Sequence, residues 1–107
     1  MRFTAWLLGV VLLSAGAQAI AAPDGVVHTV VIEAMRFSPS HLEVNVGDTV
    51  IWKNQDPFPH TATSEKNGFD SKTIAAGRTW KFVAKKTGTF PYLCTLHETM
   101  KGTLVVK

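Results

Sequence analysis

The stretch LEVNVGDTVIWKN, residues 42–54, constrains the fold more than any other part of the chain. Residues 42–46 alternate apolar and polar side chains, and this period of two predicts a half-buried strand. Gly47 and Asp48 are typical turn residues, and residues 49–54 return as a second strand. Two short strands joined by a turn are typical of an all-β fold.

Short apolar runs separated by turn residues continue to the end of the chain, and no stretch has the length and period of a helix. Further strands are predicted at Val26–Ile32, Thr61–Ser64, Arg78–Val83, Thr89–Cys94 and Thr103–Val106. Five aromatic residues are assigned to the core: Trp52, Trp80, Phe82, Phe90 and Tyr92. About seven to eight strands at this spacing predict an all-β protein with a two-sheet Greek-key β-sandwich.

The first 21 residues have the pattern of a secretory signal peptide. Met1 and Arg2 form a short positive start, residues 5–17 are largely apolar, and small residues follow. Cleavage near residues 19–22 would leave a single domain, 22–107, in an exported protein, and we expect a periplasmic location. The apolar run is short for a spanning helix, so no stable membrane insertion is expected after cleavage.

The charge of the chain argues against a nucleic-acid partner. Without Arg2, ten lysines and arginines face eight aspartates and glutamates, which leaves a net charge of +2. The basic side chains are spread along the sequence with no run longer than two, as is typical of a solvated surface. We therefore expect no nucleic-acid binding.

Residues 92–100, YLCTLHETM, gather three kinds of metal donor. Cys94 is the only cysteine, and His97 and Met100 follow at three-residue intervals. A lone cysteine cannot form an internal disulfide, so in an exported protein it is inert, reactive or bound to a metal. Only the last interpretation also accounts for His97 and Met100. Together with His60 they offer two imidazoles, a thiolate and a thioether, and this set suits copper.

The predicted strands would bring these four donors to one end of the sandwich. Cys94 would end a strand, and His97 and Met100 would lie on the loop that leads to the last strand. His60 would follow a proline-containing loop after another strand. A site of two histidines and one cysteine with a weak thioether lies between the preferences of Cu(II) and Cu(I), so little would have to move when an electron arrives.

Five segments together resemble the small type 1 copper proteins, the cupredoxins, and most closely their amicyanin and plastocyanin branch: LEVNVGDTVIWKN, PHTATS, GFDS, GTFPYLCTLHETM and KGTLVVK. The spacing C-x-x-H-x-x-M is similar to that of amicyanin. The resemblance implies one type 1 copper ion per chain, with His60, Cys94, His97 and Met100 as ligands. It also implies that single electrons pass between a donor and an acceptor redox protein, which dock transiently near His97. We expect a monomer that is not an enzyme.

Three positions depart from the pattern of these relatives. Thr61 stands where the family usually has asparagine after the first ligand histidine, and its hydroxyl is expected to bridge part of the gap. Leu96 and Glu98 replace the prolines of amicyanin-like loops, so the loop is expected to be less rigid. Four apolar residues are expected to form a small docking patch near His97: Pro57, Phe58, Pro59 and Leu96.

Other functions fit parts of the pattern. Nitrite reductases and multicopper oxidases place a histidine beside the type 1 cysteine, but here Leu93 and Thr95 flank Cys94. A copper carrier or storage protein would need further exposed ligands, but the only other methionine of the mature chain is Met35, and His28 and His41 are assigned to the surface. A metal-free adhesion domain leaves the four donors unexplained. Electron transfer is therefore the leading prediction, with copper delivery as the alternative.

Overall fold

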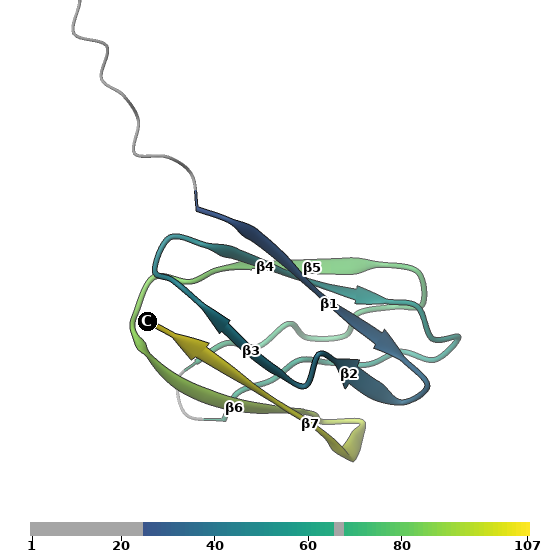
Figure 1. Cartoon of the computed structure of the whole chain (residues 1–107). Coiled ribbons are helices and arrows are strands. Elements are labelled where there is room, and N and C mark those ends of the chain that lie inside the picture. Colours follow the sequence, from purple (N-terminus) through teal and green to yellow (C-terminus); the bar gives the residue numbers. More distant parts are fainter. Residues whose placement is uncertain (1–24, 66–67) are drawn as a thin grey trace, which may run out of the picture.

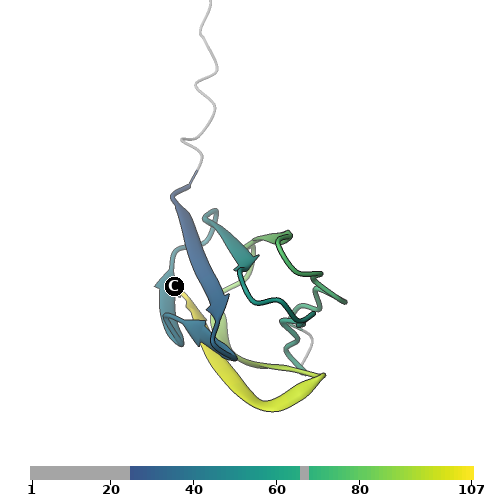
Figure 2. The ribbon, with the colours of Figure 1, turned by 90° about the vertical axis from the view of Figure 1, so that its right-hand side faces the viewer.

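The computed structural model describes residues 25–65 and 68–107, which form two packed β-sheets (Figure 1). The first sheet has the order β2-β1-β4-β5, from Arg36–Ser38, Val27–Glu33, Thr49–Asn54 and Thr79–Val83. The second has the order β3-β7-β6, from His41–Val44, His97–Val106 and Gly88–Cys94. Figure 2, turned by 90°, shows the two layers from the side. The predicted all-β two-sheet sandwich is confirmed.

Three segments differ from the predicted strands. The segment 61–64 forms only isolated bridges at Thr63, and the short strand β2 was not predicted. The last strand begins at His97, whereas Thr103 was expected.

The predicted signal peptide, 1–21, lies outside the described residues. Within residues 25–65 and 68–107, no helix is long and apolar enough to cross a membrane.

The core lies between the sheets and is centred on Trp52, which is fully buried. The centroid of its ring system lies 5.3 Å from that of Phe69, 5.4 Å from that of Trp80 and 5.5 Å from that of Tyr92. Inward-facing aliphatic residues from four strands complete the core: Val30, Ile32, Val44, Val50, Leu104 and Val106. Of the five aromatic residues assigned to the core, Trp52 and Tyr92 are buried and the other three pack against its edge.

Tyr92 is held in the core by its cross-strand partner. Tyr92 on β6 is paired with Gly102 on β7, and a Cβ atom at Gly102 would overlap the tyrosine ring. The glycine therefore leaves the space in which the ring lies flat against the sheet. Burial of the phenol favours its neutral form and raises the pKa of Tyr92 from 10.0 to about 12.

We expect this shift to make the fold less stable in alkali. In the unfolded chain the phenol ionises near pH 10.0, whereas in the folded protein it stays neutral to about pH 12. The free energy of unfolding should therefore fall as the pH rises through this window, by about 3 kcal/mol in total. Urea unfolding below and above the window measures this loss, and Tyr92→Phe should lack that part of it. An equal loss in both proteins would contradict the assignment to Tyr92.

The end of the sandwich where the β3–β4 turn lies is organised by a buried carboxylate. Gly47 has φ +99°, which favours glycine. The Asp48 carboxylate accepts hydrogen bonds of 2.9 Å from the backbone N–H groups of Asn45 and Val26. It accepts a third hydrogen bond from the His28 side chain. The Asn45 N–H, together with His28 and Val26, lowers the pKa of Asp48. The predicted turn at Gly47–Asp48 is confirmed.

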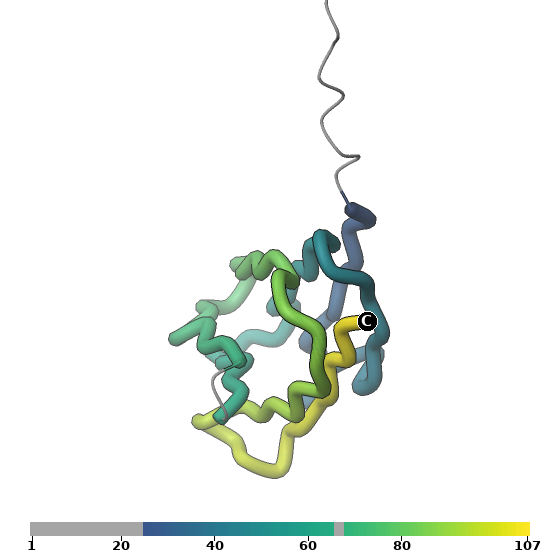
Figure 3. Tube along the Cα trace, turned by 90° about the vertical axis from the view of Figure 1, so that its left-hand side faces the viewer, coloured from purple at the N-terminus to yellow at the C-terminus, as the bar shows by residue number. Residues whose placement is uncertain are grey.

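At the other end of the sandwich, three connections converge. These are the β1–β2 turn, the segment after β4 and the β6–β7 turn (Figure 1). Figure 3 shows the chain between β4 and β5 running beside β6, where the backbones of Thr63 and Leu93 exchange two hydrogen bonds of 2.9 Å. His60 is bridged in the same way to Ile74. The four predicted donors belong to this end.

Candidate metal centre

Three of the predicted donors converge where the core reaches this end of the sandwich. Cys94 is the last residue of β6, is fully buried, and lies on the inward face together with Tyr92. His60 is fully buried after the loop that follows β4. His97 opens β7 and is half-buried, so it is the least enclosed of the three. The site thus has a closed interior and one edge toward solvent.

The distances between the donor atoms are those of a site for one ion. Cys94 Sγ lies 3.7 Å from His60 Nδ1 and 3.9 Å from His97 Nδ1. One donor atom from each of the three residues lies within 4.8 Å of the others. The two imidazole rings are inclined by 59°, with their centroids 5.2 Å apart. Two nitrogens and a sulfur therefore face a common point.

The hairpin between β6 and β7 is tighter than the sequence suggested. His97 pairs with Cys94 and Lys101 pairs with Leu93, so residues 98–100 bulge without a partner on β6. The expectation that His97 and Met100 lie on a loop before the last strand is therefore wrong in its bounds. Backbone pairing with β6 extends β7 to His97. The bulge at residues 98–100 lets the chain bend where a loop was expected.

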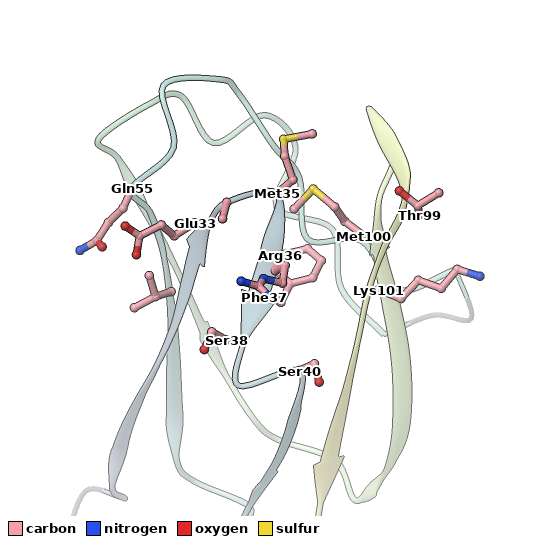
Figure 4. A pocket seen from close by; sticks show the side chains of 12 residues that line it. Glu33, Met35, Arg36, Phe37, Ser38, Ser40, Gln55, Thr99, Met100 and Lys101 are labelled. Atoms are coloured by element: carbon pink, nitrogen blue, oxygen red, sulfur yellow. The ribbon is translucent and has the colours of Figure 1, made fainter.

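Met100 lies in this bulge and points inward. It is buried, and Gly102, Leu104 and Val106 continue the same inward row along β7. A groove of about 920 Å³ opens beside it, and Met35, Phe37, Gln55 and Lys101 also line this groove (Figure 4). In Figure 4 the thioethers of Met35 and Met100 lie at the same end of the groove. Met35 itself is 38% exposed.

The ring of His60 is oriented by a residue that the sequence analysis missed, Asp56. The Oδ2 atom of Asp56 lies 2.8 Å from His60 Nε2, and both side chains are buried. An ionised carboxylate only accepts hydrogen bonds, so Nε2 carries the proton and Nδ1 keeps its lone pair toward Cys94. The sequence feature that could have pointed to Asp56 is a carboxylate four residues before a candidate ligand histidine.

The same carboxylate also fixes the β1–β2 turn. Asp56 Oδ1 accepts a hydrogen bond of 2.7 Å from the Ala34 N–H, and Oδ2 accepts one of 3.0 Å from the Met35 N–H. Both turn residues have positive φ, 54° and 59°. Burial alone would raise the pKa of Asp56, but the hydrogen bonds from Met35, His60 and Ala34 outweigh it and leave the pKa below its usual value.

Thr61 joins the two segments that carry the donors. Its backbone N–H donates to Cys94 Sγ at 3.3 Å, and its Oγ1 accepts a hydrogen bond of 2.9 Å from the Thr95 N–H. The two threonine hydroxyls lie 3.1 Å apart. The prediction that the Thr61 hydroxyl bridges these segments is confirmed.

The chemistry of this donor set fits copper. Thiolate and thioether sulfurs favour Cu(I), imidazole nitrogens suit both oxidation states, and two histidines with one cysteine and a weak methionine form the usual blue-copper set. His60 Nε2 is occupied by Asp56, so Nδ1, 3.7 Å from Cys94 Sγ, is the ring nitrogen left to bind a metal beside the sulfur. A structural zinc site would more often have four strong ligands in a closed tetrahedron.

Comparison with known proteins supports the same class. The family model described as cupredoxin-like domain matches residues 3–106, and the chain belongs to this family. The chloroplastic plastocyanin of Pisum sativum is 29% identical over 107 residues, which cover 84% of this chain and 64% of that protein. The amicyanin of Paracoccus versutus is 25% identical over 81 residues, 71% of this chain and 61% of that protein.

A solved structure of an amicyanin variant in its Cu(I) form superimposes with a TM-score of 0.70 at 28% identity. The match covers 83% of this chain and 88% of that one. The chain spans less than two thirds of the length of the two curated relatives described above. The family match and the structural similarity confirm the cupredoxin resemblance of the sequence.

Proposed function

We propose that this protein is an exported carrier of single electrons, located in the periplasm, with one type 1 copper ion held by His60, Cys94, His97 and Met100. The observation that carries the proposal is the convergence of two imidazole nitrogens and the only thiol within 4.8 Å. A bound copper ion would supply a one-electron couple. The similarity to plastocyanin and amicyanin supports the same function.

The surrounding protein keeps the donors in place in both oxidation states. Cys94 and His97 belong to paired strands, and His60 is bridged to Ile74 by backbone hydrogen bonds of 2.7 and 3.2 Å. Thr61 ties the His60 segment to the hairpin. A frame that is fixed before the electron arrives needs little rearrangement, and this favours fast transfer.

Electrons would enter and leave beside His97, because it is the only one of the three converging donors that is not fully enclosed. Phe58 is 54% exposed and Leu96 is 50% exposed, and they neighbour the two ligand histidines in sequence. Together with the exposed Pro57 and Pro59 they provide the apolar docking patch. A small apolar patch suits brief contacts with redox partners rather than a permanent complex.

A charge placed in this patch should slow electron transfer between two copies of the protein. We expect Leu96→Lys to lower the self-exchange rate between oxidised and reduced protein about tenfold at low salt, because two like charges must meet and lose water in the contact. NMR line broadening in mixtures of the two forms measures this rate. Leu96→Gln, which is polar but uncharged, is the matched control.

The docking site would be misplaced if Leu96→Lys exchanged electrons as fast as the natural protein at every salt concentration. Glu98→Gln gives an independent check with the opposite sign. It removes a like charge next to His97, so the self-exchange rate should rise at low salt and converge with that of the natural protein at high salt. The visible spectrum should be the same in all of these variants if only docking is affected.

Copper delivery is a second candidate, and the placement of Met35 favours it. This thioether is 38% exposed and lines the groove that Met100 also lines (Figure 4). Thioethers are soft ligands that suit Cu(I). An exposed methionine in the same groove as Met100 is what a carrier would use to pass Cu(I) in or out.

The two functions are separated by measuring copper transfer. For a carrier, Cu(I)-loaded protein mixed with a metal-free thiolate acceptor should lose its copper, and Met35→Ala should slow that loss severalfold. For an electron carrier, repeated oxidation and reduction should leave the copper bound. Retention of copper in the presence of the acceptor, equal for both proteins, would reject the delivery function.

A further inference from the structure

Asp56 combines three features that the electron-transfer site does not by itself require. It is a carboxylate with 6% exposure, it accepts a hydrogen bond from a candidate copper ligand, and it fixes a turn of the neighbouring strands. Among the ion pairs of residues 25–65 and 68–107, its only partner is His60. No lysine or arginine offsets its charge there.

We propose that Asp56 is a positioning residue that holds His60 in the ligating tautomer and sets a low reduction potential for the site. This inference rests on the proposed function. Asp56 acts through His60 and through its charge, and it does not bind the metal.

The positioning role follows from the hydrogen bonds. Both oxygens of Asp56 are engaged, Oδ1 by Ala34 and Oδ2 by Met35 and His60, at distances between 2.7 and 3.0 Å. The backbone N–H of Asp56 is itself held by Asn54 Oδ1 at 2.9 Å. The carboxylate therefore cannot turn away without breaking several contacts. His60 Nε2 stays protonated, and Nδ1 is left as the only ligand atom.

The effect on potential follows from burial. The oxidised centre carries one more positive charge than the reduced centre, so a nearby negative charge stabilises the oxidised form more. Solvent screens such a charge weakly when the carboxylate is buried, and His60 connects it directly to the site. Asp56 thus makes the copper centre harder to reduce than a site with a neutral acceptor at this position.

The turn connects this control to the groove. The Met35 N–H donates to the same oxygen as His60 Nε2, so the backbone of the exposed methionine and the buried ligand share one acceptor. Asp56 accepts two hydrogen bonds from the Ala34–Met35 turn and one from His60. A partner that displaced the turn would remove the first two. The carboxylate would then be less well fixed against His60.

Asp56→Asn tests the proposal, because it keeps the shape of the side chain and removes the charge. Protein-film voltammetry of the copper-loaded protein should show the equilibrium shifted toward the reduced form by about tenfold, equivalent to a rise of about 59 mV. Glu43→Gln is the matched control. That carboxylate is exposed on β3 and paired with Lys107, so its removal should shift the ratio less than twofold. Asp56→Glu, which keeps the charge, should restore most of the low potential.

A second measurement is independent of copper. Long-range ¹H–¹⁵N correlation spectra of the metal-free natural protein should show His60 as the Nε2–H tautomer, with a slowly exchanging proton. The Asp56→Asn variant should lose that protection. A mixture of tautomers in the natural protein would overturn the positioning role, and this test stands even if Asp56→Asn fails to fold.

The outcomes distinguish failure of this inference from failure of the proposed function. If Asp56→Asn keeps the visible band and its ratio of reduced to oxidised protein changes less than twofold, the effect on potential is overturned. The proposed electron transfer would still stand. Absence of a type 1 copper spectrum in the natural protein would reject the proposed function and with it the effect on potential. The tautomer of His60 would then still decide the positioning role.

Discussion

Cys94→Ser is expected to abolish the intense visible absorption of the Cu(II) protein. That absorption requires charge transfer from a thiolate sulfur, and Cys94 is the only cysteine in the chain. Serine presents a harder oxygen that is protonated at neutral pH, so affinity for Cu(I) should also fall, by at least about 100-fold. Titration with copper, followed by visible spectroscopy and a competing chelator, measures both effects.

Met100→Leu is the matched control for this change. It removes the weakly binding thioether but keeps the thiolate and both imidazoles, so the visible band should shift and remain intense. Circular dichroism shows whether each variant is folded. A folded Cys94→Ser protein with an undiminished band would mean that the absorption arises elsewhere.

Trp52→Ala should cause the largest loss of stability of any single core substitution. Its side chain is fully buried and lies against three other aromatic rings at centroid distances of 5.3 to 5.5 Å. Truncating a buried tryptophan to alanine costs about 3–5 kcal/mol, out of a typical total of about 5–15 kcal/mol for a small domain. Urea unfolding of the metal-free protein should therefore show a strongly reduced midpoint.

Phe58→Ala provides the comparison for Trp52→Ala. Phe58 is also aromatic but 54% exposed, so its loss should change the free energy of unfolding by no more than about 0.5 kcal/mol. Copper should raise the stability of the Trp52→Ala protein, because only the folded chain offers the assembled site. Equal midpoints for the natural protein and Trp52→Ala would show that the core is not centred on this residue.

The strands of the sandwich could be predicted wherever one face is buried. The alternation in residues 42–46 and 49–54 predicted two strands that follow one another in the chain, and the structure has them as β3 and β4, one in each sheet. The strand β2 could not be found in this way, because three residues are too few to show a period. The start of β7 was also missed, since a bulge at residues 98–100 leaves no regular alternation there.

The donor residues could be predicted from residue type and spacing, but their surroundings could not. Cysteine, histidine and methionine at fixed intervals indicate metal chemistry directly. Asp56 is an ordinary loop aspartate in the sequence, and only the folded chain shows that it reaches both His60 and the β1–β2 turn. The sequence likewise did not indicate the positive φ values of Ala34 and Met35 in that turn.

The type 1 copper site is the central claim, and one measurement tests it most directly. Natural protein loaded with one equivalent of Cu(II) is examined by visible absorption and EPR. A site formed by His60, Cys94, His97 and Met100 should give an intense thiolate-to-copper charge-transfer band and a narrow parallel hyperfine splitting. A nearly colourless protein with the wide splitting of ordinary Cu(II) complexes would contradict the claim.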